Sequence, residues 1–138
     1  MSMSLTMTKA FLDSKGFKYQ ADEERNIINT GFGGLKNKGT IKIMLFFDND
    51  DRVVAIRSFE FCTFPEDKKA AMYKACSEMN YKYRWTKFYV DEDANQITIA
   101  DDAVIQLDSC GEEIFELMYR LADIADEAYP YLMKAIWQ

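Results

Sequence analysis

The sequence predicts a single α+β domain, spanning residues 1–138, in which a mostly antiparallel five-stranded sheet packs with three helices. The apolar pattern runs helix, three strands, helix, two strands, helix along the chain. Connections among the first three strands are too short for the crossovers that parallel strands need. The length and the 49% of hydrophobic residues are those of one domain with a buried core. These observations together indicate the α+β class.

The N-terminal part of the chain is expected to form a short helix and then a strand. Met7, Ala10 and Phe11 recur at the spacing of one helix face, and Gly16 marks the stop. The first strand is expected around residues 26–30. The run GFGGLKNKG follows it and invites comparison with a phosphate-binding loop. Because a strand and not a helix comes next, the run is interpreted as a flexible hairpin loop.

Two strands joined by the acidic turn DNDD are predicted next, over residues 40–48 and 52–62. This turn and a second acidic run at residues 91–95 raise the question of calcium binding. Counting from Asp48 puts Val53 where an EF-hand loop needs glycine, and the second run fails the same test. Aspartate and asparagine side chains bond to their own backbone in turns, which explains both runs without a metal.

The second helix is predicted to begin in the run TFPEDKK. Thr63 and Glu66 have the spacing of a capping box, and Pro65 lies in the first turn, where its missing N–H costs nothing. The buried stripe is predicted to comprise Ala71, Met72, Ala75, Cys76 and Met79. Alanine and methionine at this spacing are typical of a core, so Cys76 is interpreted as a small apolar filler.

A long helix is predicted to close the chain, with Ser109 and Glu112 as a second capping box. Pro130 should bend or restart this helix, because it cannot donate to the carbonyl of Asp126. Cys110 lies in the first turn and is interpreted as inert, since acidic neighbours oppose a thiolate there. One apolar side of the helix is long enough to cross a whole sheet: Ile114, Leu117, Met118, Leu121, Ala125, Ala128 and Leu132.

The stretch YKYRWTKFYVDEDANQITI mixes basic and aromatic residues, as a single-stranded nucleic-acid platform would. It is interpreted as two strands, 84–91 and 96–100, with Trp85 and Tyr89 on one face and Phe88 on the other. The chain carries 17 basic and 23 acidic residues, a net charge of -6. That sign opposes phosphate binding, so no nucleic-acid partner is expected.

The sequence contains no histidine. This removes the usual activation of serine and cysteine nucleophiles, the common zinc and haem ligands, and the usual proton shuttle. Three cysteines without paired spacing are interpreted as reduced thiols. We therefore expect a protein that is not an enzyme and that holds no metal or cofactor. Without a signal peptide or a membrane-spanning run, a cytoplasmic location is expected.

The strand at residues 41–47 is apolar on both faces. Ile41, Ile43 and Leu45 share one face, and Met44 and Phe46 share the other. A sheet covered by helices on one side does not need the second set. Three explanations stay open at this point: a second helical cover, a contact with another chain of the same or a different protein, or a ligand surface.

Three runs carry a resemblance to a known family: FFDNDDRVVAIRSF, ACSEMNYKYRWTKFYVDED and IADEAYPYLMKAIW. They resemble the YbjN domain family of bacteria, which is labelled as sensory transduction regulators, over residues 17–137. The resemblance implies the fold of the type III secretion chaperones, frequent homodimers, and surfaces that hold extended segments of client proteins. It implies no catalytic residues. Chaperone activity in this chain would be an analogy at the level of the fold.

The sequence therefore predicts a non-enzymatic protein-interaction or regulatory domain, chaperone-like and homodimeric. It should bind a partner protein, or itself, through an apolar sheet face or a strand edge. The alternative is a small-ligand sensor with a pocket between the sheet and the C-terminal helix. No membrane partner is expected. The candidate partner or dimer contacts are Met44, Phe46, Trp85, Phe88 and Tyr89.

Overall fold

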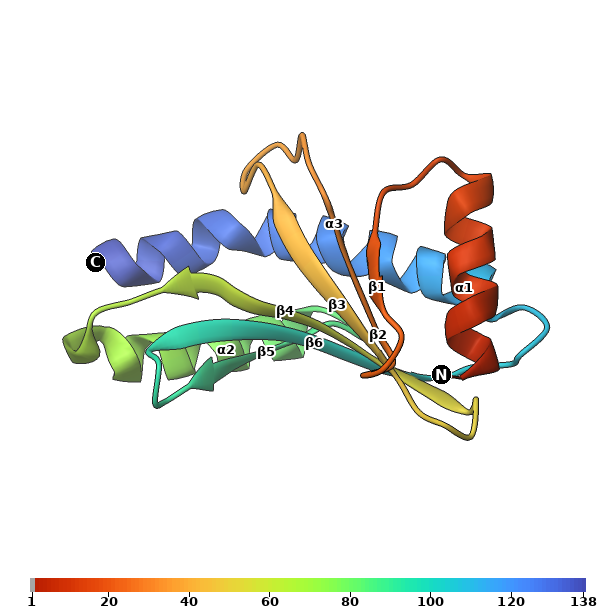
Figure 1. The fold of residues 1–138 in the computed structure, drawn as a ribbon. Helices are drawn as coiled ribbons and strands as arrows, with labels where there is room; N and C mark the ends of the chain where they lie inside the picture. Colours follow the sequence, from red (N-terminus) through yellow and green to blue (C-terminus); the bar gives the residue numbers. More distant parts are fainter. Residues whose placement is uncertain (1) are drawn as a thin grey trace.

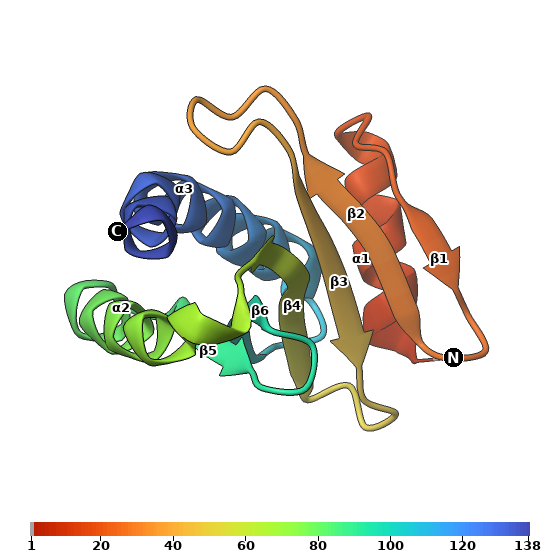
Figure 2. The same cartoon turned by 90° about the vertical axis from the view of Figure 1, so that its left-hand side faces the viewer.

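In the computed structural model, which describes residues 2–138, three helices lie on one face of a six-stranded antiparallel sheet (Figures 1 and 2). The strand order across the sheet is β1-β2-β3-β4-β6-β5. A short 3-10 helix, Glu66–Lys68, precedes α2. The elements in chain order are α1 (Met3–Ser14), β1 (Gln20–Asp22), β2 (Ile27–Phe32), β3 (Ile41–Phe47), β4 (Val53–Thr63), α2 (Lys69–Lys82), β5 (Lys87–Asp91), β6 (Gln96–Val104) and α3 (Cys110–Trp137).

The α+β class and the order of the long elements are as predicted, but the predicted number of strands is wrong. The additional strand is β1, which pairs with β2 through three residues, Gln20 to Asn29, Ala21 to Ile28 and Asp22 to Ile27. Two of its three residues are exposed, so it has no buried face. A strand that short, without alternating apolar residues, leaves no periodic signal in a sequence.

The core forms between the helices and one face of the sheet. Alternation in β3 buries Ile41, Ile43 and Leu45 and leaves Met44 and Phe46 on the opposite face. From α2 the core receives Met72, Ala75, Cys76 and Met79, four of the five predicted residues, whereas Ala71 is exposed. Each large apolar side chain buried here contributes about 1.5–3 kcal/mol of burial free energy.

Both predicted capping boxes are wrong. Thr63 is the last residue of β4, and α2 begins only at Lys69, without a side-chain cap. Glu66 is occupied elsewhere, because it accepts from Asn95 and pairs with Lys69. Ser109 does occupy the N-cap position of α3, but its side chain makes no capping hydrogen bond.

Helix α3 runs from Cys110 to Trp137 as a single helix that contains Pro130. The predicted restart at Pro130 therefore does not occur. Its buried side matches the predicted stripe except at Leu117, which is half-buried, and it extends further at both ends to Cys110 and Ile136. In Figure 1 this helix passes along most of the length of the molecule, above the sheet.

Helix α1 crosses α3 at a glycine. A Cβ atom at Gly111 would lie 2.6 Å from Cβ of Phe11, closer than real side chains approach. Beside this crossing, the rings of Phe11 and Phe115 meet edge to face with centroids 5.8 Å apart. The N-terminus of α1 is capped by Ser2, whose side chain accepts from the N–H of Leu5. Gly111 thus sets how closely α1 can pack on α3.

Replacement of Gly111 by alanine should push α1 away from α3, because the new methyl group would overlap Phe11. We expect a loss of about 1–3 kcal/mol in the free energy of unfolding, the usual cost of overpacking. Urea denaturation measures it. Gly33→Ala is the control, since a Cβ there meets nothing within 4 Å. Equal stability of the two variants would contradict the close crossing.

A carboxyl group lies in the covered face of the sheet. Asp101 is 5% exposed, and its Oδ2 has no hydrogen-bond partner. Burial, with a smaller contribution from Asp102, raises the pKa of Asp101 to about 6, against opposing effects of Arg57 and Lys87. The folded state therefore holds this proton more tightly than the unfolded state. Stability should fall as pH rises from about 4 to about 6 and then level off.

Replacement of Asp101 by asparagine should remove this penalty, because the amide has the same shape and no charge. We expect the variant to be more stable than the natural protein by on the order of 2 kcal/mol near neutral pH, with a smaller difference at acidic pH. Urea midpoints at both pH values measure it. A difference that did not change with pH would mean that the charge of Asp101 is not the cause.

Candidate protein-binding surface

The face of the sheet opposite the helices is uncovered and carries large apolar side chains. We call it the open face. Val53 and Phe59 are each 44% exposed, and Val104 is 82% exposed. Phe46 is half-buried and contacts Phe59 edge to face, with ring centroids 6.2 Å apart. Met44 is also half-buried. This is more exposed apolar surface than a sheet face facing only water needs.

Strands β3 and β4 pair along only part of their length. Their ladder runs from Phe47 opposite Val54 to Met44 opposite Arg57 and then stops. Continuing the register would place Ile43 opposite Ser58, but no such pairing exists. Figure 2 shows the two strands diverging from this point, toward the start of β3 and the end of β4. We call the gap between residues 41–43 and 58–61 the split.

A bulge in β4 turns this strand away from β3. The register with β6 shifts between Ser58 and Cys62, and Glu60 has a φ of 53°. A glutamate in this left-handed region is strained and is found where a fold requires it. The shift also buries Phe61, whose ring meets Tyr129 of α3 with centroids 5.7 Å apart. The bulge is therefore one cause of the split.

The β2–β3 loop, residues 33–40, is the second cause, because it is fastened to α3 and holds the start of β3 beside that helix. The buried Asp126 carboxylate accepts the backbone N–H groups of Asn37, at 2.9 Å, and Lys38, at 2.7 Å. The Nδ2 atom of Asn37 donates to the Asp126 carbonyl at 3.0 Å. This is the carbonyl that Pro130 cannot bond. The proline thus frees an acceptor that the loop uses.

Two cavities lie at the split, and a third lies beside it. One of about 210 Å³ is lined by Met44, Phe59 and Lys42, among others. A second, of about 280 Å³, lies between Ile41 and Phe61 and also contacts Lys42 and Phe59. The third, of about 960 Å³, extends from Lys42 over Gly31 toward Phe17, Tyr19 and Phe32. Lys42 lines all three, so they lie next to one another on β2, β3 and β4.

The structure does not bring all five predicted contact residues together. Met44 and Phe46 lie on the open face beside Phe59, which is not among the five predicted contacts. Tyr89 is 43% exposed on β5, and its partner on β6 is Thr98, two positions from Ala100, which pairs with Arg57. Tyr89 therefore lies on the same face, near its far edge.

Phe88 and Trp85 lie elsewhere. Phe88 is 0% exposed, packed in the core, and is not available to a partner in this fold. Trp85 precedes β5, has a φ of 64°, and lies against Arg120 of α3 at 4.8 Å from guanidinium to ring centroid. It does not share a face with Tyr89, because the strand begins only at Lys87 and the left-handed residue breaks the alternation.

The outer edge of β5 is already bonded. The side-chain amide of Asn80, on α2, accepts from the N–H of Phe88 at 2.7 Å and donates to its carbonyl at 2.9 Å. These are the bonds that a neighbouring strand would make. Lys87 folds back onto the carbonyls of Asn80 and Tyr83. Covering an edge in this way is a known protection against unwanted strand pairing.

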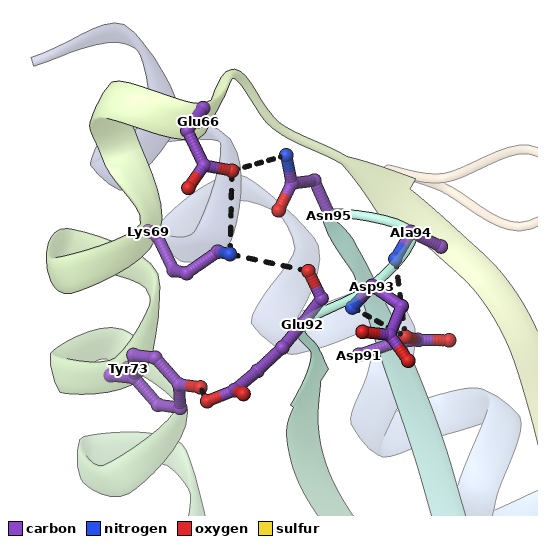
Figure 3. A network of polar contacts seen from close by, with 8 residues as sticks. All are labelled: Glu66, Lys69, Tyr73, Asp91, Glu92, Asp93, Ala94 and Asn95. Carbon is purple, nitrogen blue, oxygen red and sulfur yellow. Dashed lines mark hydrogen bonds and ion pairs between the residues drawn. The ribbon is translucent and has the colours of Figure 1, made fainter.

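The acidic turn between β5 and β6 is a structural contact with α2 (Figure 3). Asp91 Oδ1 accepts from the N–H groups of Asp93 and Ala94, each at 3.2 Å. Lys69 donates to the Glu92 carbonyl at 3.2 Å, and the Glu92 carboxylate accepts from the Tyr73 hydroxyl. The interpretation as turn chemistry is confirmed. Among residues 2–138, no group of three or more histidine, cysteine, aspartate or glutamate residues is placed to hold a metal ion.

The three cysteines are free and buried. Burial raises the pKa of the Cys62 thiol to about 11 and that of Cys76 to about 12. It also raises the pKa of Cys110. Each stays a protonated thiol near neutral pH, which makes it a poor nucleophile. Cys76 lies in the core, as predicted. At Cys110 burial is the main cause of the raised pKa, and the acidic neighbour Glu113 adds to it.

Comparisons with known proteins agree with this architecture. A family model described as YbjN, "Putative bacterial sensory transduction regulator", matches residues 4–134. No curated protein matches the sequence. In the part of the chain that the structure describes, no helix has the length and hydropathy needed to cross a bilayer.

Solved structures with a similar fold include YbjN from E. coli, described as a "putative transcription regulator", at a TM-score of 0.64, 8% identity and 92% coverage of both chains. A chain of the ExsC–ExsE complex matches at 0.57 and 11% identity, over 92% of this chain and 96% of that chain. A chain of the HopA1–SchA chaperone–effector complex matches at 0.56 and 9%, over 90% and 94%. This likeness shows the fold, which type III secretion chaperones share.

Replacement of Asp126 by alanine should release the β2–β3 loop from α3, since two backbone N–H groups lose their acceptor. We expect a loss of about 2 kcal/mol in the free energy of unfolding. The amides of Asn37 and Lys38 should also exchange faster with solvent, which hydrogen exchange measures. Asp123→Ala, at an exposed position on the same helix, is the control. Unchanged exchange at Lys38 would contradict this role of Asp126.

Proposed function

This chain belongs to the YbjN family, and we propose that it acts by binding a partner protein through the open face of its sheet and is not an enzyme. The observation that carries the proposal is the apolar surface around Met44 and Phe59, which no element of residues 2–138 covers. Each such side chain would contribute about 1.5–3 kcal/mol of burial free energy if a partner covered it.

The nature of the surface supports a protein partner. Its apolar centre is flanked by Lys42 and Glu60, which is the arrangement of a protein interface with an apolar core and a polar rim. Two of the structures with this fold are complexes with another protein, ExsC with ExsE and SchA with HopA1. Those partners belong to those proteins. The shared fold supports the proposal that this chain also presents its sheet to a protein.

We include self-association in the proposal, as a homodimer. A closed dimer with a two-fold axis would bury the same patch on both copies. The exposed residues Val53 and Val104 extend the apolar area to the β4–β6 pair, where they lie opposite each other. A light-scattering mass of twice the chain mass would support the dimer.

The alternative function, a small-ligand sensor, needs a pocket between the sheet and α3. Side chains fill that space. Met118, Leu121 and Ala125 of α3 face the sheet and are 0% exposed. Ile56 and Ile99 lie on the covered face of the sheet and are also fully buried. We therefore favour the protein-binding function.

Replacement of both Met44 and Phe59 by alanine should weaken partner capture, because these side chains form the apolar centre of the open face. Residues at the centre of an interface contribute about 2 kcal/mol or more each, so recovery of the partner should fall at least about tenfold. The measurement is affinity purification of the tagged chain from its native host, with quantitative mass spectrometry and light scattering.

Phe59 is 44% exposed and Met44 is half-buried, so the double variant should stay folded, which circular dichroism checks. Tyr81→Ala is the control, a truncation of an exposed aromatic residue on α2, outside the open face. If the double variant recovered the same proteins in the same amounts as the natural chain, and kept the same mass in solution, the open face would not be the binding surface.

A further inference from the structure

We propose that the split between β3 and β4 receives an extended segment of the partner protein as an added strand, with two consecutive apolar residues next to an acidic one. The proposal rests on the proposed function and names the chemistry of its partner. It differs from docking on the open face alone, because the partner's backbone and not only its side chains would be bound.

The first reason is the unpaired backbone of two strands. Residues 41–43 pair with β2 on one side and have no strand on the other. Residues 59–61 of β4 lie where the ladder with β6 is interrupted and likewise have no partner on β3. Strand backbone presents N–H and C=O groups at fixed spacing, and another extended chain is the ligand that matches them. A strand that enters between antiparallel neighbours is antiparallel to one and parallel to the other.

The second reason is that the gap is held open from both sides. The loop bonded to Asp126 keeps the start of β3 beside α3, and Lys38 lies between the rings of Phe61 and Tyr129, 5.7 and 5.4 Å from their centroids. On the other side the left-handed Glu60 turns β4 away. A gap fixed in advance lowers the ordering cost of binding.

The third reason is the position of the two smaller cavities. One is lined by Met44 and Phe59, on the open face, and the other by Ile41 and Phe61, which are buried residues, together with Lys42 and Phe59. Successive side chains of a strand point to opposite faces, so two consecutive residues would enter one cavity each. Their volumes, about 210 and 280 Å³, are below the roughly 300–1,000 Å³ typical of small-molecule sites and suit single apolar side chains.

The charge of Lys42 is the reason for expecting an acidic residue beside the two apolar residues of the partner segment. Lys42 is exposed, lines all three cavities and has no ion pair within residues 2–138. A carboxylate on the β3 side of the apolar pair would meet its ammonium group, whereas Glu60, which lines the two smaller cavities, would repel one on the β4 side. The other edges are less suited to a partner, because Asn80 bonds the edge of β5 at Phe88 and β1 is three residues long. The split is therefore the favoured place for strand addition.

Selection of a displayed library of random short peptides on the immobilised full chain supplies the probe. We expect enriched peptides to carry two consecutive β-branched or aromatic residues next to aspartate or glutamate. A synthetic copy should protect from hydrogen exchange those amides of residues 41–43 and 59–61 that point into the split. An N-methyl group between its two apolar residues should lower affinity at least about fivefold, because it removes a backbone donor and leaves the side chains unchanged.

A charge exchange tests the third residue. Lys42→Glu should weaken the acidic peptide by about threefold at low salt, and a peptide with lysine in place of its acidic residue should recover the loss. Lys36→Glu, an exposed position in the loop outside the three cavities, is the control. Equal effects of the two variants would remove Lys42 from the site.

The outcomes separate this inference from the proposed function. If no such peptides are enriched, if protection falls on other amides, or if N-methylation never lowers affinity, strand addition in the split is wrong. Peptides that tolerate N-methylation but lose affinity in Phe59→Ala would leave the open face as the binding surface. Failure of the proposed function instead shows as unchanged partner capture by the Met44 and Phe59 double variant.

Discussion

Helix α3 is the element on which the other parts of the molecule pack. Its N-terminal turn receives α1 at Gly111, where the two backbones approach without an intervening side chain. Its middle buries Leu121 and Ala125 in the core that it shares with α2 and the sheet. Near its C-terminal third it binds the β2–β3 loop through Asp126 and contacts β4 through Tyr129. Because the other elements pack on this one helix, all three helices lie on the same face of the sheet.

That one-sided arrangement has two consequences for the sheet. The opposite face keeps Met44, Phe46 and Phe59 uncovered, which a chain of this length could have buried with one further helix. Strands β3 and β4 also separate, because the loop before β3 and Phe61 of β4 contact α3 at different residues. Pro130 contributes directly, because it leaves the carbonyl of Asp126 free for Asn37. Proline usually ends a helix, but here it frees a carbonyl group that binds a loop.

The same features set the chemistry that the protein can perform. Its thiols are buried and protonated. The acidic turn between β5 and β6 forms hydrogen bonds with its own backbone and with α2. The split exposes apolar side chains, unpaired strand backbone, Lys42 and Glu60. Groups of these kinds suit the extended polypeptide that we propose as the ligand. Asn80 closes one edge of the sheet to such pairing, so the protein restricts where another strand could join.

The sequence by itself determined the fold class, the long elements and their buried stripes, because helical and strand periodicity are local and α2 and α3 follow them over several turns. It also placed Met44 and Phe46 on a second face of β3. It missed β1, which is too short to show a period, and it put Trp85 on the face of Tyr89, whereas Trp85 is left-handed and precedes β5. It put Phe88 on the opposite face from Tyr89, where Phe88 lies, but could not show that this face is fully buried there. Only the tertiary structure decided that this second face stays open and that β3 and β4 separate. Both depend on contacts between residues far apart in the chain, Asn37 with Asp126 and Phe61 with Tyr129, which no local pattern encodes.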